Sequence, residues 1–544
     1  MLPSGRLFED TDKPNEDIMG STLFNLLAEA QEKYPDKAAI AQVERKVRLT
    51  YRELYERVIR FAEGCTKLGL QKGDKIIACL PNWPEYVITL YAAARAGFVL
   101  VPVNPRFKRN EIEFILRSSG ARAAITAVET DFARYQVFQD CQKGIPSLEH
   151  IICVSPMGLV DHNLLSFEDV IVLGMHADPE EACNTSSSDV AAIVYTSGTT
   201  GIPKGAILSH KSLLFSSSAM NVALENSERD VVLVVVPVCH IFGLSLCIMS
   251  VATKSTFVLM ERFSPETVFE VVEREKVTVH HGVSTMFVLE LNHPNRSKYD
   301  LSSLRTGIVA ATPCPYEIVE RIRSELGLNP ILSYGMTETS PSLTASHFEN
   351  EAWVYTTVGR VLSGVSLRVV DEWGNMLPNG EVGELLCKTP GLMMGYYENE
   401  EATRRAIDQN GWFHTGDLAR LNDDGYVTIV GRIKEMISRG GLKIYPKEVE
   451  ELIYQHPAVQ EAAVVGIPDP VLGERSCACI TLKAGRSLTP NEIRLLCQEH
   501  LADYKVPDVI EIMDVLPLSG SGKIYKMELA KIMREKYPPV YHAK

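Results

Sequence analysis

The sequence predicts an α/β protein in which a large N-terminal domain is followed by a smaller C-terminal domain. Strand-like and helix-like segments alternate through the first half, which is typical of a parallel sheet covered by helices. After about residue 358, short β-type runs separated by Gly, Asn and Pro turns replace this alternation. The chain has 544 residues, 45% of them hydrophobic, and this length exceeds what one hydrophobic core normally organises.

The alternation begins with a helix predicted after Thr50, over residues 51–70, with Gly69 as its stop signal. Beyond it, apolar runs predict strands, and the segments between them predict helices. The strands are expected at 75–80, 98–103 and 121–126, and the helices at 83–95 and 109–120. Because parallel strands need such crossover helices, we expect these strands to share one parallel sheet.

The segment from Val358 to Val430 predicts a different, mostly antiparallel subregion. Its apolar runs are short, such as LRVV at 367–370, GELLCK at 383–388 and YVTIV at 426–430, and turn sequences such as PNGE and DDGY separate them. A charged segment follows Gly431 and Arg432, and after it comes a small α+β pattern. We therefore predict a domain junction near Lys434, which divides the chain into residues 1–433 and 434–544.

One stretch has the length of a membrane span, because residues 231–253 carry no charged side chain. However, Pro237, His240 and Gly243 interrupt it, and its first part is a β-branched run typical of a buried parallel strand. The stretch therefore predicts a strand, a loop and a helix, without a transmembrane segment.

The chain is acidic: 55 Lys plus Arg against 69 Asp plus Glu give a net charge of −14. Without a basic stripe, such a chain is poorly suited to bind nucleic acid or an anionic membrane through bulk charge. Its 12 cysteines are scattered without a C-x-x-C pair, and the acidic N-terminus lacks the apolar core of a signal peptide. These features predict a cytoplasmic protein with reduced thiols.

The strongest local signal is the sequence YTSGTTGIPKG at residues 195–205, directly after the apolar run DVAAIV. Glycines allow the backbone to approach a ligand closely, and successive amide groups form an anion-binding nest. Lys204 adds a positive charge. An ordinary Ser/Thr/Gly surface loop would not need this lysine, and the glycine spacing differs from the G-x-x-x-x-G-K-[ST] loop. The segment therefore predicts a phosphate-binding loop.

This loop resembles the signature loop of the ANL superfamily, which comprises acyl-CoA synthetases, peptide-synthetase adenylation domains and firefly-type luciferases. Further segments resemble the motifs of that superfamily in the same order. These are VCHIFGL at 238–244, YGMTE at 334–338, TGD at 415–417, GRIKE at 431–435 and PLSGSGK at 517–523. The sequences TGIVAATPCP, SYGMTETSP and SRGG together look most like the medium-chain fatty acyl-CoA synthetase branch.

The resemblance implies a fold and a reaction. The N-terminal domain would consist of layered α/β subdomains plus a distorted β-barrel-like subregion, and the α+β C-terminal domain would be small and mobile. The activity would be that of an acid–CoA ligase that uses ATP, Mg²⁺ and CoA and forms an acyl-adenylate. The alternatives are an enzyme that passes the acyl group to a carrier protein or an amine, and a catalytically silent nucleotide-binding protein. A homodimer is a further open alternative.

The first half-reaction brings a carboxylate and a phosphate together. Two like charges about 4 Å apart repel by about 4 kcal/mol at an effective dielectric constant of ~20, which corresponds to roughly a thousandfold in rate. A cation between them removes this penalty. The resemblance assigns this role to Lys523, in the glycine-rich sequence SGSGK; a solvated surface lysine is the alternative.

The resemblance also assigns the contacts to the nucleotide. Glu338 would hold Mg²⁺ on the phosphates, since magnesium favours carboxylate and phosphate oxygens, while Thr337 and Lys204 would bind phosphate oxygens. Tyr334 would stack on adenine, although a buried core tyrosine is the alternative. The nucleotide-binding residues are Thr196, Ser197, Gly198, Thr199, Thr200, Gly201, Ala310, Ala311, Thr312, Tyr334, Gly335, Met336, Asp417, Ile429 and Arg432. Asp417 and Arg432 would bind the ribose hydroxyls.

The sequence SRGGLKI at 438–444 resembles the CoA-facing loop of acyl-CoA synthetases, with Gly440, Gly441 and Lys443 along the path of CoA. Leu442 stands where relatives often have a polar residue, which leaves the contacts to CoA open. Because this loop and Lys523 belong to the same small domain, the two half-reactions would need different domain orientations. Lys434 matches the hinge residue of the family; an exposed lysine at a helix end is the alternative.

The resemblance implies an acyl pocket lined by three segments, residues 240–246, 281–286 and 307–312, which are small and apolar in this chain. Its residues are His240, Phe242, Gly243, Val283 and Gly307. They predict a medium-chain fatty acid or another apolar acid, aryl or alicyclic, as the small-molecule substrate. Chain length does not follow, because an apolar pocket discriminates weakly per methylene. His240 is also compatible with an ordinary core histidine.

Overall fold

The computed structural model describes residues 8–9, 20–128, 131, 133–155, 164–178, 185–196, 203–312, 314–348, 351–518 and 524–538. The chain divides into two compact units. The described residues of the larger unit lie within 7–367 and 387–413, and those of the smaller unit within 368–386 and 414–544. The short strand β1 (Phe8–Glu9) belongs to the larger unit.

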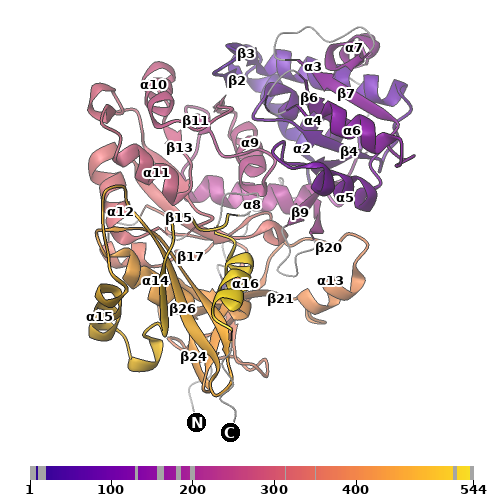
Figure 1. Ribbon diagram of the computed structural model, residues 1–544. Coiled ribbons are helices and arrows are strands. Elements are labelled where there is room, and N and C mark those ends of the chain that lie inside the picture. The colour runs from indigo at the N-terminus through magenta and orange to yellow at the C-terminus, as the bar shows by residue number, and fades with distance from the viewer. Residues whose placement is uncertain are drawn as a thin grey trace. The chain divides into compact units, whose positions relative to one another are not determined.

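One sheet of the larger unit is parallel over most of its width. The order of these parallel strands is β9 (Val190–Thr196), β5 (Val99–Pro102), β4 (Lys75–Cys79), β6 (Ala123–Ala127), β7 (His150–Val154) and β8 (Leu165–Ser166). The helices around them are α3 (Tyr51–Lys67), α4 (Pro84–Ala96), α5 (Arg109–Ser119), α6 (Tyr135–Gln142) and α7 (Phe167–Leu173) (Figure 1). This arrangement confirms the alternation predicted for the first half of the chain.

Local sequence explains where these helices begin and end. Thr50 and Glu53 form a capping box, in which each side chain accepts a hydrogen bond from the backbone N–H of the other, so α3 starts at Tyr51. Helix α4 starts at Pro84, whose missing N–H costs nothing in the first turn. Gly97 ends α4 with φ 75°, a left-handed conformation that favours glycine.

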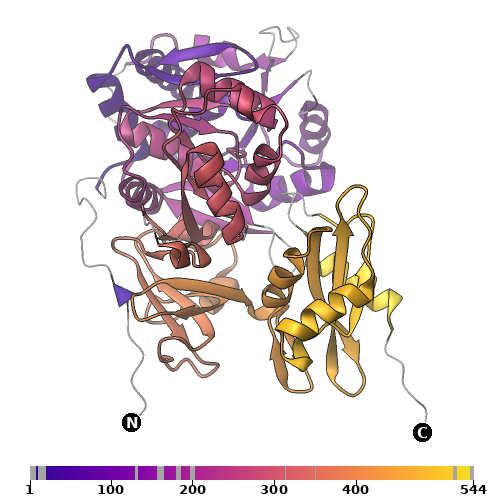
Figure 2. The same ribbon diagram turned by 90° about the vertical axis from the view of Figure 1, so that its left-hand side faces the viewer.

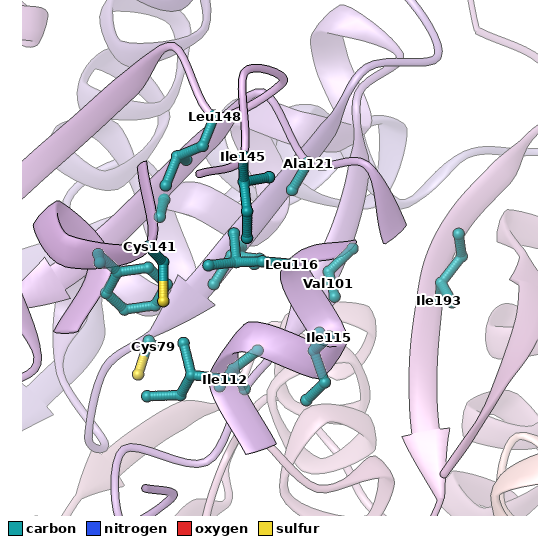
Figure 3. Packing of buried hydrophobic residues seen from close by; sticks show 14 of the residues in the cluster. Cys79, Val101, Ile112, Ile115, Leu116, Ala121, Cys141, Ile145, Leu148 and Ile193 are labelled. Carbon is teal, nitrogen blue, oxygen red and sulfur yellow. The ribbon is translucent and has the colours of Figure 1, made fainter. Parts of the chain in front are cut away.

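The core of this sheet is built on the apolar face of α5. Ile112, Ile115 and Leu116 follow the spacing of one helical face and are buried. They pack with Cys141 of α6 and Val101 of β5 in one hydrophobic cluster (Figure 3). The predicted helix at 109–120 is therefore the amphipathic element that covers this part of the sheet.

A second sheet of the larger unit has parallel strands in its centre and antiparallel strands at its edges. Its order is β17 (Arg360–Val361), β16 (Ser342–Ala345), β15 (Asn329–Gly335), β14 (Thr306–Val309), β13 (Val279–His280), β11 (Val231–Val234), β12 (Thr256–Leu259), β2 (Ala38–Gln42) and β3 (Val47–Thr50). Further helices of the larger unit are α2 (Leu23–Lys33), α8 (His210–Ala223), α9 (Ile241–Thr253), α10 (Pro265–Glu275), α11 (Ser284–Leu291) and α12 (Tyr316–Arg321).

The uncharged stretch at 231–253 forms strand β11, a loop that contains Pro237 and His240, and helix α9. This confirms the predicted strand, loop and helix. Among the residues that the structure describes, no helix combines the length and apolar character needed to cross a membrane.

Strands β10 (Lys204–Ser209) and β20 (Gly395–Tyr396) extend the first sheet in antiparallel fashion beyond β9. This corrects the prediction of one antiparallel subregion from Val358 to Val430, because residues 387–413 belong to the larger unit. The backbone of β20 pairs with the edge of β10, and helix α13 (Glu400–Ala406) follows it. Such a two-residue strand forms because the edge of the neighbouring strand offers unpaired backbone groups. Local sequence does not reveal where that edge lies.

The smaller unit contains most of a sheet with the order β18 (Ser366–Val370), β19 (Gly383–Lys388), β21 (Phe413–Leu421) and β22 (Val427–Arg432). The runs predicted at 367–370, 383–388 and 426–430 are strands of this sheet. Strands β21 and β22 form the antiparallel hairpin expected at DDGY.

The C-terminal part of the smaller unit has its own sheet and helices, drawn in orange and yellow in Figure 2. Its strands are β23 (Ile437–Arg439), β24 (Leu442–Ile444), β25 (Val459–Asp469), β26 (Gly473–Leu482) and β27 (Val509–Ile512), and its helices are α14 (Pro446–Tyr454), α15 (Pro490–His500) and α16 (Lys526–Lys536). Alternate residues of β25 point to opposite faces. Val464 packs in a core with α14 and α15, whereas Val465 packs in a core with α16.

The observed layers confirm the predicted fold class: a large α/β part followed by a small α+β part. The domain junction at Lys434 and the mobility of the C-terminal part stay predictions.

Candidate active site

Parallel strands of the second sheet bring several predicted site residues to one edge. His240 follows β11, Val283 follows β13, Ala310 follows β14, and Met336 follows β15. Neighbouring strands among β11, β13, β14 and β15 pair in parallel, so the segments after their carboxyl ends emerge at the same side. This is the usual position of ligand sites in open α/β sheets.

The predicted phosphate-binding loop connects two antiparallel strands. Thr196 ends β9, Lys204 begins β10, and these two residues are direct partners in the ladder. The Thr196 hydroxyl donates to the Lys204 carbonyl over 3.4 Å. Ser197, Gly198, Thr199, Thr200 and Gly201 lie outside the described residues. The hairpin strands on both sides therefore fix where this loop starts and ends.

The predicted magnesium motif follows β15. Tyr334 and Gly335 end the strand, and Thr337 and Glu338 lie in a short 3₁₀ turn over Thr337–Thr339. A side chain at Gly335 would place its Cβ 1.8 Å from the Pro341 carbonyl oxygen, so only glycine fits this bend. The backbone carbonyl of Glu338 accepts a hydrogen bond of 2.8 Å from the Met393 N–H.

A tyrosine that the sequence did not single out lies between the two motifs. The Tyr396 hydroxyl donates to Glu338 Oε1 over 2.8 Å, and the Lys204 ammonium lies 5.0 Å from the centre of the Tyr396 ring. Burial and the Glu338 carboxylate raise the pKa of Tyr396 well above its usual value. Tyr396 is therefore a neutral hydrogen-bond donor, held between a cation and a carboxylate.

The chemistry of Glu338 fits a Mg²⁺ ligand. Its Oε1 atom accepts from Tyr396, whereas Oε2 has no hydrogen-bond partner among the residues that the structure describes. A carboxylate with one oxygen fixed and the other open can bind a hard cation together with phosphate oxygens.

The segment predicted to lie beside adenine follows β14. Ala310 donates from its N–H to the Gly282 carbonyl over 3.3 Å, and the hydroxyls of Thr312 and Ser284 are 3.0 Å apart. Ala311 has a φ of 69°, in the left-handed region that an alanine adopts only where its surroundings require it. These contacts join the segment to Gly282 and to Ser284 at the start of α11, on either side of Val283.

Helix α9 starts immediately after His240, and Gly243 lies in its first turn. A Cβ at Gly243 would lie 2.3 Å from the Pro237 carbonyl oxygen, so this glycine permits close packing of the loop on the helix. Phe242 forms an edge-to-face contact with His281, with 6.4 Å between the ring centres. Thus two of the three segments expected to line the acyl pocket meet here.

His281 is buried and uncharged. Its Nδ1 atom accepts a hydrogen bond from the Ile308 N–H over 3.0 Å, and burial lowers its pKa to about 3. Gly307, which was also predicted in the pocket, lies on β14 beside β13. A Cβ there would lie 1.7 Å from the His280 carbonyl oxygen, so the glycine is required for strand packing in addition to any role toward substrate.

The smaller unit contains the predicted ribose contacts. Asp417 on β21 and Arg432 on β22 are direct partners in the antiparallel ladder, and Arg432 Nε lies 3.2 Å from Asp417 Oδ1. Ile429 lies on the same hairpin, and its carbonyl accepts a hydrogen bond of 2.6 Å from the Lys447 ammonium. The structure therefore brings Asp417 and Arg432 together, and their contact with the ribose stays a prediction.

The remaining predicted residues of the smaller unit lie in turns. Lys434 is in the short 3₁₀ turn Ile433–Glu435. Gly440 and Gly441, with φ 57° and 84°, form the tight turn between β23 and β24, and Lys443 is exposed on β24. Lys523 lies outside the described residues. Just beyond that gap, the Tyr525 N–H donates to the Pro517 carbonyl over 2.7 Å.

The fold and these motifs define an adenylate-forming enzyme, in which ATP activates a carboxylic acid. A family model for AMP-binding enzymes matches residues 27–397, and the model for the C-terminal domain of these enzymes matches residues 448–523. The chain is 35% identical to the putative acyl-CoA synthetase YngI of Bacillus subtilis, over 94% of this chain and 97% of YngI.

It is also 33% identical to the human mitochondrial medium-chain acyl-CoA ligase ACSF2, over 95% of this chain and 88% of ACSF2. The ATP-bound crystal structure of MatB from Rhodopseudomonas palustris superposes with a TM-score of 0.85 at 27% identity, covering 95% of this chain and 100% of MatB. The chain therefore belongs to the family of AMP-binding enzymes, in the acyl-CoA synthetase branch of the ANL superfamily. It is an ATP-dependent, AMP-forming ligase.

Proposed function

We propose that this enzyme joins an apolar carboxylic acid to CoA through an acyl-adenylate, with release of pyrophosphate and then AMP. The observation that carries the proposal is the arrangement of Lys204 and Glu338 around Tyr396. It supplies a cation and a carboxylate beside the hairpin loop that the sequence assigns to phosphate. Asp417 and Arg432 supply a matching pair for the ribose.

In the first half-reaction, an oxygen of the substrate carboxylate bonds to the α-phosphorus of ATP, and the bond from that phosphorus to pyrophosphate breaks. Lys523 neutralises the carboxylate and the phosphate, which lowers the repulsion between them. Lys204, Thr196 and Thr337 bind phosphate oxygens. Mg²⁺, when bound by Glu338, neutralises further charge on the phosphates.

In the second half-reaction, the sulfur of CoA attacks the acyl carbon, the thiol loses its proton, and the bond to AMP breaks. The turn at Gly440 and Gly441 carries no side chains, so the thin pantetheine arm passes along its backbone. The Lys443 ammonium lies exposed on the adjoining strand. Lys434 acts as the hinge between the orientations that the two steps need.

The substrate is a medium-chain fatty acid or another apolar acid. The segments at 240–246, 281–286 and 307–312 contain no Lys, Arg, Asp or Glu. His281 is neutral because of its low pKa, so it provides no counter-charge for a second carboxylate. The similarity to the medium-chain acyl-CoA ligase ACSF2 supports the same substrate class.

The decisive experiment is a panel of carboxylic acids assayed for AMP release with and without CoA. Rapid CoA-dependent release with apolar acids would support the proposal. Release that depends on an amine or a carrier protein, with no response to CoA, would support the alternative acceptor.

The role of Lys523 is tested separately. Lys523→Ala should abolish acid-dependent ATP–pyrophosphate exchange but still form thioester from supplied acyl-adenylate, whereas Lys531→Ala at an exposed position of helix α16 should behave like the wild type. Normal exchange by Lys523→Ala would exclude the proposed role of this lysine.

A further inference from the structure

Tyr396 connects two motifs that are far apart in the sequence. Strand β20 places Tyr396 opposite Ala206 of β10, two residues after Lys204. The Tyr396 ring lies 5.0 Å from the Lys204 ammonium, and its hydroxyl donates to Glu338, 58 positions earlier in the chain. Both contacts are made inside the larger unit.

We propose that Tyr396 is a positioning residue of the adenylation step, whose hydroxyl holds the Glu338 carboxylate in the orientation that binds Mg²⁺ on ATP. This inference rests on the proposed role of Glu338. Tyr396 acts through Glu338 and does not itself bind the phosphates.

Glu338 is anchored at two points by one short segment. The Met393 N–H holds its backbone carbonyl, and the Tyr396 hydroxyl holds Oε1, each over 2.8 Å. Rotation of the carboxylate is thereby restricted, while Oε2 keeps no hydrogen-bond partner among the described residues. Because Mg²⁺ demands nearly ideal octahedral geometry, a ligand with a fixed orientation binds it better than one that rotates.

The direction of the hydrogen bond is also determined. The Glu338 carboxylate can only accept hydrogen bonds, so in this contact the Tyr396 hydroxyl is the donor. The ammonium of Lys204 is attracted to the face of the neutral ring. Tyr396 can therefore support Glu338 without placing a second negative charge next to the phosphates.

The test is the Mg²⁺ dependence of ATP binding, measured by calorimetry in the absence of acid and CoA. Tyr396→Phe keeps the ring over Lys204 and removes only the hydroxyl. We expect the Mg²⁺ concentration for half-maximal ATP binding to rise about tenfold, as on loss of an outer-shell partner of a metal ligand. At saturating Mg²⁺, ATP affinity should return to that of the wild type, which a general packing defect would not allow.

The neighbouring Tyr397 is a matched control. Its hydroxyl has no hydrogen bond to a described residue, and its ring faces the Lys75 ammonium at 5.5 Å. Tyr397→Phe should leave the Mg²⁺ dependence unchanged, and thermal unfolding of each variant checks that the fold is retained. An equal shift in both variants would overturn the proposal.

The variant Glu338→Gln distinguishes a failure of the role proposed for Tyr396 from a failure of the metal-binding role proposed for Glu338. If Glu338→Gln raises the Mg²⁺ requirement and Tyr396→Phe does not, Tyr396 is no positioning residue and the proposed function stands. If Glu338→Gln has no effect on the Mg²⁺ requirement, the assignment of Glu338 as metal ligand fails and the inference fails with it. In the Glu338→Gln background, Tyr396→Phe should add no further shift.

Discussion

Arg432 lies beside Asp417 with 3.2 Å between its Nε atom and Asp417 Oδ1, although the two side chains differ greatly in exposure. Asp417 is buried at 8% exposed, whereas the Arg432 side chain is 56% exposed. The hairpin of β21 and β22 makes them direct partners. Asp417 is therefore held in place, and Arg432 keeps an open side on which it can reach a ligand.

Asp417→Asn should weaken ATP binding. The asparagine keeps the size of the side chain but replaces a charged acceptor, and a hydrogen bond to a charged group contributes about 1.5–3 kcal/mol. We expect the KM for ATP to rise at least about tenfold, with little change in kcat, because the ribose does not change during the reaction. Steady-state kinetics at saturating acid and CoA measure this effect.

Asp424→Asn provides the control, since Asp424 is an exposed carboxylate in the turn of the same hairpin. It should leave the KM for ATP unchanged. A large fall in kcat for Asp417→Asn, with an unaltered KM, would contradict the assignment to the ribose.

Gly441→Trp should suppress thioester formation and spare adenylation. The open turn at Gly441 leaves nothing within 4 Å of an added Cβ, so the tryptophan would project into the proposed path of CoA. Pyrophosphate exchange reports the first half-reaction, and acyl transfer from supplied acyl-adenylate reports the second. Loss of both activities to the same extent would argue against a selective role of this turn.

The matched control for Gly441→Trp is Gly485→Trp in the same unit. Gly485 also has a positive φ, 72°, and an added Cβ there also meets nothing within 4 Å. A tryptophan at position 485 therefore imposes a similar backbone strain, but away from the turn at Gly440 and Gly441. Both half-reactions should be normal in this variant.

The sequence predicted the elements whose signals are local. The Thr50 cap of helix α3 and the spacing of Ile112, Ile115 and Leu116 on helix α5 are visible within a few residues. Both α3 and α5 formed where they were predicted. The partnership of Tyr396 with Glu338 left no such signal, because it depends on a two-residue strand pairing with the edge of β10. Tyr396, which lies outside the predicted motifs, thus connects the motif of Lys204 with the motif of Glu338.

Another relationship that no local pattern revealed is that of Lys526. Its ammonium lies 2.8 Å from Glu435 Oε2, next to the proposed hinge, and 2.8 Å from Glu450 Oε1 on α14. Burial opposes the charge on Lys526, but the carboxylates of Glu450 and Glu435 outweigh it and raise the pKa of Lys526. The ion pair of Lys526 with Glu435 therefore connects the start of helix α16, just after the Lys523 segment, to the hinge segment.

Lys526→Met should destabilise the smaller unit, because it leaves two carboxylates close together without their cation. We expect a loss of about 2 kcal/mol, below the range for fully buried pairs since Lys526 is 22% exposed. Denaturant unfolding monitored by circular dichroism measures the change. Lys531→Met on the same helix, where the side chain is 65% exposed, should cost little, and equal losses in the two variants would contradict the role of Lys526.

Stability should fall as the pH drops below the ordinary histidine pKa of about 6.5, partly because of His281. Burial, with smaller contributions from His280 and Arg305, lowers the pKa of folded His281 to about 3. Between pH 3 and 6.5 the unfolded chain therefore binds more protons, and each such group removes up to about 1.4 kcal/mol per pH unit as the pH falls. His281→Asn, whose carbonyl can still accept from the Ile308 N–H, should reduce the loss between pH 6.5 and 5.5 by about 1 kcal/mol. Denaturant unfolding at the two pH values tests this, with the exposed His176→Asn as control; an unchanged pH dependence in His281→Asn would show that this histidine binds protons equally in the folded and the unfolded chain.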